Sequence, residues 1–485
     1  MSHQTLLPFV LQGTATAMSP PSEIGVSEVR KRRVAGSQMG ASYAVPIVGL
    51  PNDELQQVKK DLTMVPQDSA FGGPPTPSFD AFATDETHIH VPRFYGYHRW
   101  GSPDTCELSD GHPMQCAFVG TLNQTQQEAT AQTLMQLSAE PNGGLLVLPC
   151  GYGKTVCALY IAHKLGRRTL VLVHKGFLVQ QWHERVASFL PEATCGKIQQ
   201  NVVDADADIV VGMVQSISKR EYPEHIMSSF GTVIIDEAHH MSAPVFSRAL
   251  RCLPAKYICG LSATPERKDG MTRLLYYSMG DIAHRIERNP EHTLVSCILY
   301  EGGMRTEIKY RDGRVSMPLM LNALVKDATR NECIATHIVR YLEHDRYVIV
   351  LTDRIEQLKA LLQLLIDKGV GAHDIAFYIG STPASERTRA SERRCILSTY
   401  SMAKEGLDIP RLDTLVMATP KGDIVQASGR VQRKHPEKKT PLIVDFVDTF
   451  SVFEALRWKR WRFYRQEKFV CQSFNSVSRD VSWFV

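Results

Sequence analysis

The segment Leu148–Thr155 contains residue types that can bind the phosphates of a nucleotide. Its sequence, LPCGYGKT, follows an apolar run and precedes a stretch with helical spacing. Gly151 and Gly153 allow the backbone to curl, so that successive N–H groups can face one anion. The start of the following helix adds the positive end of its dipole. Lys154 can reach the β- and γ-phosphates, and Thr155 can hold Mg²⁺.

This segment departs at one position from the usual phosphate-loop pattern G-x-x-x-x-G-K-(S/T). Leu148 stands where the pattern has its first glycine, so the assignment depends on the order of strand, loop and helix. The alternative is a glycine-rich turn with an incidental lysine. We expect ATP and Mg²⁺ as ligands, and the predicted ATP-binding residues of the loop are Cys150, Gly151, Tyr152, Gly153, Lys154 and Thr155.

Two consecutive acidic residues complete the predicted site. Asp236 follows the β-branched run Val233–Ile235, which would place its carboxylate at the tip of a buried strand. There it can hold Mg²⁺ together with Thr155, and Glu237 can orient and deprotonate the attacking water. Two solvated loop acids are the alternative. The chemistry predicted from these residues is hydrolysis of ATP.

The elements that must position these residues are short apolar runs that alternate with amphipathic stretches such as Gly176–Leu190 and Ile355–Lys368. The runs are continuous, as expected for strands buried on both faces. Such alternation predicts βαβ units, parallel sheets and an α/β fold with two similar domains in tandem. The predicted strands are Leu145–Leu148, Thr169–Val173, Ile209–Val214, Val233–Ile235 and Tyr257–Leu261, then Tyr347–Leu351, Ile375–Ile379, Cys395–Leu397, Thr414–Met417 and Leu442–Phe446.

Composition limits the classes of protein that fit. The 485 residues have 43% hydrophobic and 22% charged side chains, which is ordinary for a folded globular chain. A net charge of +4 is too small to argue for nucleic-acid binding by itself. The 11 cysteines form no C-x-x-C pair, which disfavours a disulfide scaffold or a zinc finger. Neither a signal peptide nor an apolar run of membrane-spanning length is visible, so a cytoplasmic or nuclear location is expected.

Several further motifs occur in a fixed order, and together they resemble the superfamily 2 helicases over about residues 92–448. The phosphate loop and the D-E-A-H sequence at 236–239 correspond to the Walker A and B elements of that family. The other matching segments are Leu172–Lys175 (motif Ia), Gly212–Ser216 (Ib), Gly260–Thr264 (III), Val348–Arg354 (IV), Ser398–Pro410 (V) and Gln426–Arg433 (VI, Q-x-x-G-R-x-x-R).

The resemblance implies two RecA-like lobes with ATP in the cleft between them. Arg430 and Arg433 would be arginine fingers one turn apart on one helix, Gln426 would sense the γ-phosphate and Asp408 the ribose. Gln126 is favoured for adenine, although Gln124 and Gln127 lie close in sequence. Coupling between ATP and nucleic acid would involve His239, Ser262 and Thr264, and nucleic-acid contacts would come from His174, Lys175, Gln215, Arg354 and Thr399.

Within that superfamily the chain resembles the xeroderma pigmentosum group B branch. Arg267-Lys268-Asp269 stands where that branch has an R-E-D triplet, and Lys268 puts the strand-separating role of the triplet in doubt. The segment His90–Gly96 is most similar to helicases of nucleocytoplasmic large DNA viruses. If the protein is viral, the replication compartment or the virion is the expected location.

The domain organisation predicted from these segments has five parts. Residues 1–110 form an accessory region with flexible edges, 111–290 the first lobe, 291–320 a linker with a hairpin, 321–450 the second lobe and 451–485 a basic aromatic helix. In this last part, Arg457–Lys468 (RWKRWRFYRQEK) alternates basic and aromatic residues. It could bind nucleic acid or pack its aromatics on the second lobe. Upstream, Phe94 or Trp100 could cover the adenine, although a place in the core is the commoner role.

The function predicted is that of an ATP-dependent helicase or translocase acting on single-stranded or duplex DNA. The alternatives are an RNA helicase, a translocase subunit of a larger complex that does not separate strands, and a binding module with a decayed ATP site. The presence of Lys154, Asp236, Glu237, Arg430 and Arg433 argues against decay. A transcription or replication complex is the expected partner, and no membrane is expected.

Overall fold

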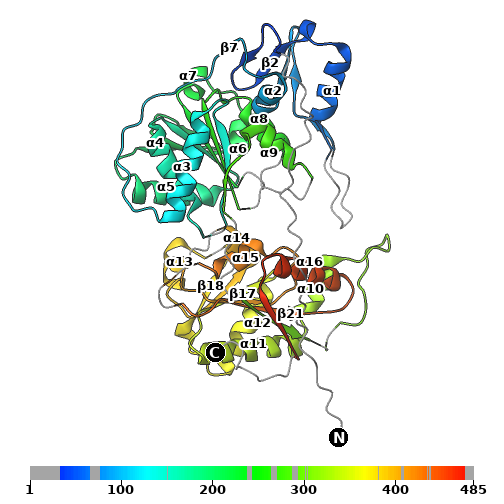
Figure 1. The fold of residues 1–485 in the computed structure, drawn as a ribbon. Coiled ribbons are helices and arrows are strands. Elements are labelled where there is room, and N and C mark those ends of the chain that lie inside the picture. The colour runs from blue at the N-terminus through cyan, green and yellow to red at the C-terminus, as the bar shows by residue number, and fades with distance from the viewer. Residues whose placement is uncertain are drawn as a thin grey trace.

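The computed structural model describes residues 33–65, 77–149, 151–237, 243–263, 270–286, 293–300, 302, 304–380, 382–405, 409–433, 435 and 438–475. Two sheets flanked by helices dominate this part of the chain (Figure 1). We call the elements from α3 to β15 (residues 124–285) lobe 1 and those from β16 to β22 (residues 294–475) lobe 2.

Lobe 1 is built on an eight-stranded sheet in the order β11-β10-β12-β9-β13-β14-β8-β15. Its strands pair in parallel, except for the antiparallel pair β10–β11. The strands are β8 (Gly143–Val147), β9 (Thr169–Val173), β10 (Cys195–Gln199), β11 (Val202–Asp204), β12 (Ile209–Met213), β13 (Thr232–Asp236), β14 (Tyr257–Ser262) and β15 (Ile282–Arg285). The helices are α3 (Gln124–Ser138), α4 (Lys154–Leu165), α5 (Gly176–Phe189), α6 (Val214–Lys219), α7 (Glu224–Met227), α8 (Ala243–Leu250) and α9 (Thr272–Met279).

Lobe 2 repeats the arrangement with a seven-stranded sheet in the order β18-β19-β17-β20-β21-β16-β22, in which every pair is parallel. The strands are β16 (Leu294–Leu299), β17 (Val348–Thr352), β18 (Ile375–Tyr378), β19 (Cys395–Thr399), β20 (Thr414–Met417), β21 (Leu442–Val447) and β22 (Val470–Asn475). The helices are α10 (Met317–Leu324), α11 (Ala328–Glu343), α12 (Ile355–Asp367), α13 (Ala384–Ala390), α14 (Tyr400–Glu405), α15 (Val425–Arg430) and α16 (Val452–Gln466).

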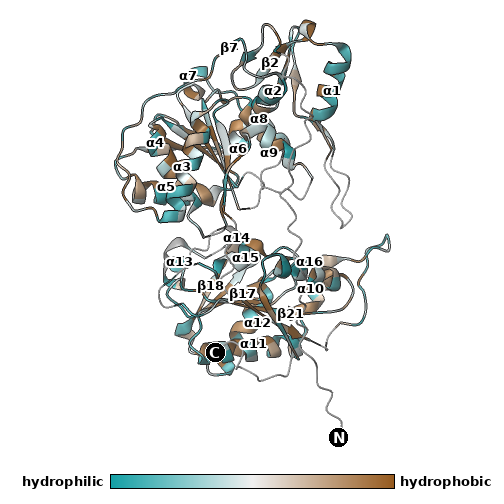
Figure 2. Cartoon of the chain, viewed as in Figure 1, coloured by the Kyte–Doolittle hydropathy of each residue, from teal (hydrophilic) through white to brown (hydrophobic). Residues whose placement is uncertain are grey.

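The predicted fold class, α/β with two RecA-like domains in tandem, is confirmed. Each of the ten predicted strands corresponds to an observed one, within two residues at each end. The central strands of both sheets are coloured as hydrophobic in Figure 2, and all residues of β8, β9, β17 and β21 are buried. Burial on both faces explains why these strands read as continuous apolar runs.

The N-terminal accessory region has a fold of its own in its described part. A small sheet in the order β5-β6-β2-β1-β7 carries the helices α1 (Asn52–Leu62) and α2 (Arg93–Trp100). Its strands are β1 (Gln38–Met39), β2 (Tyr43–Pro46), β5 (Ala83–Thr84), β6 (His88–Val91) and β7 (Thr105–Cys106), and beside it β3 (Thr63–Met64) pairs with β4 (Phe79–Asp80).

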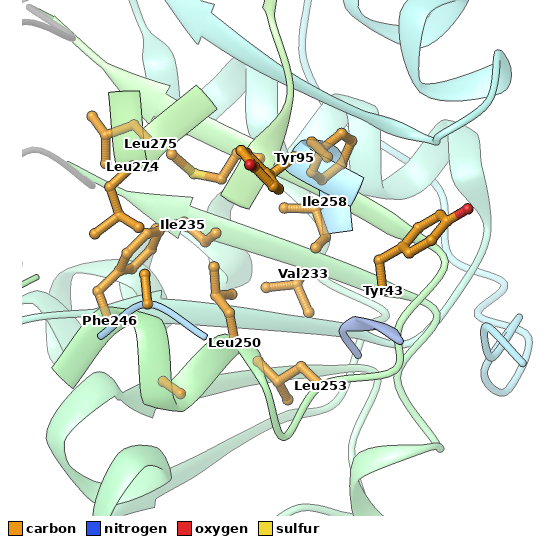
Figure 3. Close-up of a cluster of buried hydrophobic side chains, with 14 of the residues drawn as sticks. Tyr43, Tyr95, Val233, Ile235, Phe246, Leu250, Leu253, Ile258, Leu274 and Leu275 are labelled. Atoms are coloured by element: carbon orange, nitrogen blue, oxygen red, sulfur yellow. The ribbon is translucent and has the colours of Figure 1, made fainter. Parts of the chain in front are cut away.

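This small sheet shares one hydrophobic cluster with lobe 1. Tyr43 and Tyr95 belong to the same buried cluster as Val233 and Ile258 of the large sheet (Figure 3). The buried Arg93 guanidinium donates to the carbonyls of Ala255 and Lys256, at 2.8 and 3.2 Å. A buried charge needs such partners, so the accessory sheet is joined to lobe 1 by polar as well as apolar contacts.

The segment 291–320 corrects the prediction of a linker. Its residues Leu294–Leu299 form β16, which lies between β21 and β22 in the sheet of lobe 2. The run LVSCIL contains a serine and lies between polar neighbours, and burial of its central residues in a parallel sheet accounts for its apolar character. Within the described residues of this segment, an isolated antiparallel bridge between Lys309 and Val315 stands in place of the expected hairpin.

The structure also places the two upstream aromatic residues and the C-terminal basic aromatic segment. Phe94 and Trp100 are each 1% exposed, so both are core residues rather than covers for adenine. The C-terminal segment is the helix α16, followed by the edge strand β22. In α16, Tyr464 packs in the core of lobe 2 and Phe463 is partly buried against the same cluster. Trp458 and Trp461 of this helix remain exposed. Packing on the second lobe is therefore confirmed for one face of the helix only.

Among the described residues, no helix combines the length and the apolar character that crossing a membrane requires.

Candidate ATP site and nucleic-acid edge

The phosphate loop lies between β8 and α4, as predicted. Gly151 and Gly153 have φ of 89° and 81°, a left-handed conformation that glycine adopts at little cost. α4 begins at Lys154, directly after Gly153, so the first N–H groups of the helix and the curled loop are adjacent. This arrangement of a curled loop and a helix start is of the kind that binds phosphate.

Gln126 is the glutamine that contacts this loop. Its Nε2 donates to the carbonyl of Tyr152 at 3.1 Å, and a Cβ at Gly153 would come within 2.4 Å of the same nitrogen. Gln126 also closes a capping box with Asn123 at the start of α3. Gln124 and Gln127, by contrast, bond to residues of their own segment. The loop side of α3 is therefore occupied by Gln126, the residue favoured for adenine recognition.

The two acidic residues lie beside the lysine of the loop. Lys154 Nζ is 3.2 Å from Glu237 Oε1, and this ion pair is largely shielded from solvent, with side-chain exposures of 11% and 18%. Asp236 is the last residue of β13. Its burial, and next the negative charge of Glu237, raise its pKa to about 6. A carboxylate in such a site gains from a nearby cation, which is the electrostatic condition for holding a metal ion.

A buried tryptophan donates a hydrogen bond to Asp236. Trp182 Nε1 donates to Asp236 Oδ2 at 2.9 Å, and the indole is 1% exposed. This bond acts against the two larger effects and lowers the pKa of Asp236. Trp182 lies in the amphipathic stretch Gly176–Leu190, whose spacing predicts only an apolar helix face. The alternation in 176–190 gave no signal that its N–H faces a carboxylate 54 residues away.

Glu237 has an unusual backbone conformation. Its φ is 49°, in the left-handed region that non-glycine residues seldom adopt. Such residues concentrate at functional sites, where the surrounding structure compensates for the strain. The turn directs the chain out of β13 immediately after Asp236, so that the second carboxylate meets Lys154 rather than following the strand.

The arginines of motif VI come from lobe 2 but do not lie on one helix. α15 ends at Arg430, because the N–H of Val431 bonds to Ser428 three residues back and closes the last turn. The prediction that Arg430 and Arg433 share a helical face is therefore wrong. Arg430 Nε donates to the carbonyl of Ala403 at 2.7 Å within lobe 2.

Arg433 instead approaches the phosphate loop of lobe 1. A Cβ built on Gly151 would lie 3.0 Å from Arg433 Cγ, so the arginine stem is in contact with the glycine. The remaining predicted residue of this helix, Gln426, lies in its first turn and is half-buried. Arg433 is thus placed at the loop of the opposite lobe.

The residues predicted to contact nucleic acid follow the carboxyl ends of neighbouring parallel strands. In lobe 1, Gln215 Nε2 donates to the carbonyl of His174 at 3.0 Å, beside Lys175 at the start of α5. In lobe 2, Thr399 ends β19 opposite Thr352 of β17. Ligands of open parallel sheets bind at this edge, so the placement agrees with the predicted role.

Two of the remaining residues lie close to this edge. Arg354 follows β17, and its Nε donates to Asn322 Oδ1 of α10 at 2.6 Å. Ser262 is fully buried, and its carbonyl accepts the N–H of Leu148 at 3.0 Å. Motif III is thus bonded directly to the strand that leads into the phosphate loop. Cys150, His239, Thr264, Asp408 and the triplet 267–269 lie outside the described residues.

The described residues fit ATP and Mg²⁺. The hydroxyl of Thr155 and the carboxylate of Asp236 are oxygen ligands, which Mg²⁺ prefers, usually alongside phosphate oxygens. Lys154 supplies the cation for the phosphates, and the two left-handed glycines leave the space that a side chain would fill. The arrangement can bind a nucleoside triphosphate and direct a water molecule at its terminal phosphate.

Comparison with known proteins identifies the class. Residues 120–267 match the family described as type III restriction enzyme, res subunit, and residues 330–435 match the helicase conserved C-terminal domain. A protein of Acanthamoeba polyphaga mimivirus, named as an ATP-dependent RNA helicase, is 32% identical over 437 residues, which cover 88% of this chain and 84% of the relative. This chain belongs to the superfamily 2 helicases, the ATP-dependent helicase family.

A more distant relative has the same description, and solved structures share the fold. A protein of African swine fever virus with the same description is 26% identical over 380 residues, covering 70% of this chain and 72% of the relative. The helicase MrfA bound to DNA and AMPPNP has a TM-score of 0.52 at 14% identity, covering 76% of this chain and 57% of that one. A variant of Saccharomyces cerevisiae Dbp5 bound to RNA and ADP BeF3 has a TM-score of 0.50 at 14% identity, covering 72% and 90%. These two structures support the fold alone.

Proposed function

We propose that this protein is an ATP-driven helicase or translocase that moves along DNA. The observation that carries the proposal is the meeting of Lys154, Glu237 and Asp236 in lobe 1 with Arg433 of lobe 2 against the phosphate loop. An ATP site made by two lobes makes hydrolysis depend on how closely the lobes approach, which is what a motor requires.

Each residue of the site has a role that follows from its geometry. Lys154 binds the phosphates, and Thr155 with Asp236 would hold Mg²⁺, which would neutralise charge on the phosphates. Glu237 positions the attacking water and accepts its proton. Arg433 stabilises the negative charge of the transition state from the opposite lobe, and Arg430 assists as the second arginine of the motif.

The ion pair between Lys154 and Glu237 implies that ATP binding precedes release of the catalytic base. While the ammonium lies 3.2 Å from Glu237, it occupies the carboxylate that would take the proton of the attacking water. When Lys154 moves to the phosphates, Glu237 is released to accept a proton. Binding of ATP therefore activates the base, and Ser262, bonded to Leu148, would pass the change toward the nucleic-acid edge.

DNA is the substrate we favour, on the resemblance to the xeroderma pigmentosum group B branch and to DNA-virus helicases. RNA is the second candidate, because the mimivirus and African swine fever virus relatives are named RNA helicases. A third candidate is translocation along duplex DNA without strand separation, within a transcription or replication complex. This activity would use the same ATP site.

The test measures ATP hydrolysis with single-stranded DNA, duplex DNA and RNA added in parallel at one stated salt concentration. We expect stimulation by DNA. We also expect Lys154→Ala and Glu237→Gln to abolish turnover while nucleic-acid binding remains. Stimulation by RNA alone would overturn the DNA assignment, and full turnover in either variant would overturn the catalytic assignment.

A further inference from the structure

Helix α16 has two faces with different chemistry. One face is held in lobe 2 by the buried residues Phe453, Leu456, Arg460 and Tyr464. Arg460 Nε and the Tyr464 hydroxyl both donate to Asp445 Oδ2, at 2.8 and 3.0 Å. This network fixes the rotation of the helix about its axis, because a buried carboxylate must keep its donors.

The opposite face carries two exposed indoles and two exposed guanidinium groups. Trp458 and Trp461 are 49% and 39% exposed, and Arg462 and Arg465 are also exposed. Positions 461 and 462 each lie three or four residues from both 458 and 465, so the four residues form one stripe along the helix. We call these four residues the α16 stripe. No acidic side chain of the described residues forms an ion pair with either arginine.

Helix α16 lies next to the edge of lobe 2 where the sheet carries its predicted nucleic-acid residues. Arg460 Nη1 donates to the carbonyl of Lys421 at 3.0 Å, and this residue belongs to the loop that follows β20. Leu456 lies 3.1 Å from the position of a Cβ on Gly422 in the same loop. α16 is therefore fixed beside the carboxyl end of β20, the neighbour of β17.

Helix α10 connects α16 to Arg354. Met320 and Leu321 of α10 pack with Phe453 and Leu456 in one buried cluster, and Asn322 of α10 accepts the bond from Arg354. Figure 1 shows α10 and α16 side by side. Through α10, helix α16 is therefore connected to Arg354, a residue predicted to contact nucleic acid.

We infer that the α16 stripe binds single-stranded nucleic acid and extends the strand path beyond lobe 2. Arginines bind phosphates and indoles stack on bases. A single strand fits better than a duplex, because its bases can expose a face for stacking. A membrane, a protein partner or a second copy of the chain are the other occupants that the test must distinguish. The inference rests on the proposed function and adds a contact site to it.

The first experiment measures binding of fluorescent oligo(dT), oligo(U) and a blunt DNA duplex to the full chain and to Trp458→Ala and Trp461→Ala. Each indole removed should weaken binding of single strands about fivefold or more, with duplex binding and basal ATP hydrolysis unchanged. Ile366→Ala is the matched control, because it removes an exposed apolar side chain from the last turn of α12. Comparing oligo(dT) with oligo(U) distinguishes DNA from RNA as the bound strand.

The second experiment measures the salt dependence of binding for Arg462→Gln and Arg465→Gln. Each lost phosphate contact should reduce the slope of log K against log salt by about 0.7 for a single strand. Lys359→Gln, an exposed residue of α12, should leave the slope unchanged.

The outcomes separate this inference from the proposed function. A wild-type protein that binds no nucleic acid, and whose ATP hydrolysis none stimulates, would overturn both. Normal stimulation of the wild type, together with unchanged affinity and slope in the α16 variants, would overturn the stripe alone. A change in oligomeric state, in vesicle binding or in capture of a protein, with oligonucleotide affinity unaltered, would also overturn it.

Discussion

Replacing Trp182 with phenylalanine isolates one hydrogen bond to the predicted metal-binding carboxylate. The substitution keeps an aromatic ring in the core but removes the N–H that donates to Asp236 Oδ2 at 2.9 Å. Because the indole is 1% exposed and Asp236 is 8% exposed, bulk water does not reach this contact. A hydrogen bond to a charged group contributes about 1.5–3 kcal/mol.

The direction of the effect follows from the pKa of Asp236. Burial, and then the charge of Glu237, raise this pKa to about 6, while the bond from Trp182 lowers it. Removing that bond raises the pKa further. The ionised carboxylate is the form that holds Mg²⁺, so activity is present above the pKa and lost as the pH falls through it. A loss of about 1.5–3 kcal/mol displaces the acid limb upward by about one to two pH units.

The assay is kcat/KM for ATP hydrolysis between about pH 5 and pH 9, which reports groups of the free enzyme. We expect the acid limb of Trp182→Phe at higher pH, with activity close to that of the wild type on the alkaline side. Val186→Ala, a buried residue of the same helix, should lose stability without moving the limb. An unmoved limb in Trp182→Phe, or an equal loss at every pH, would refute the reasoning.

Three further outcomes are expected. Arg330→Met leaves Asp448 buried and without its pair of bonds, of 2.9 and 2.8 Å, so chemical denaturation should show a loss of about 3–5 kcal/mol; a loss below about 1 kcal/mol would mean that water replaces the pair. Arg433→Lys should lower kcat by about 10³-fold or more with little change in nucleotide affinity, and a normal kcat in rapid-quench measurements would remove it from the site. Gly153→Ala should weaken nucleotide binding in a calorimetric titration. Gly313→Ala, at a glycine with a similar φ of 83° and nothing within 4 Å of an added Cβ, should leave nucleotide affinity unchanged. An equal loss of nucleotide affinity in the two variants would show that backbone strain alone is responsible.

Strand positions could be predicted best where a strand is buried on both faces, because such a strand has a continuous apolar sequence. β9 and β20 have the bounds predicted for them, because both faces of these strands are covered. The sequence was least informative at strands with weaker burial. β10 alternates between buried and half-buried residues and β22 is largely exposed, so neither carries a continuous apolar signal.

The candidate site divides in the same way. Lys154, Asp236 and Glu237 could be predicted because they are adjacent to strand ends that the sequence marks clearly. The bond from Trp182 could not, because no local pattern reports which group a buried indole faces. The end of α15 before Arg433 was also missed, since three-residue spacing fits a continuing helix as well as a closing turn.

The two ends of the described chain are built into opposite lobes. The accessory sheet is joined to lobe 1 through Arg93 and its carbonyl partners, and α16 is joined to lobe 2 through Arg460 and Asp445. Each of these elements is therefore expected to move together with its lobe. We therefore expect the proposed approach and separation of the lobes to change the distance between α1 and α16, which a pair of dyes on these helices would measure without any label near the ATP site.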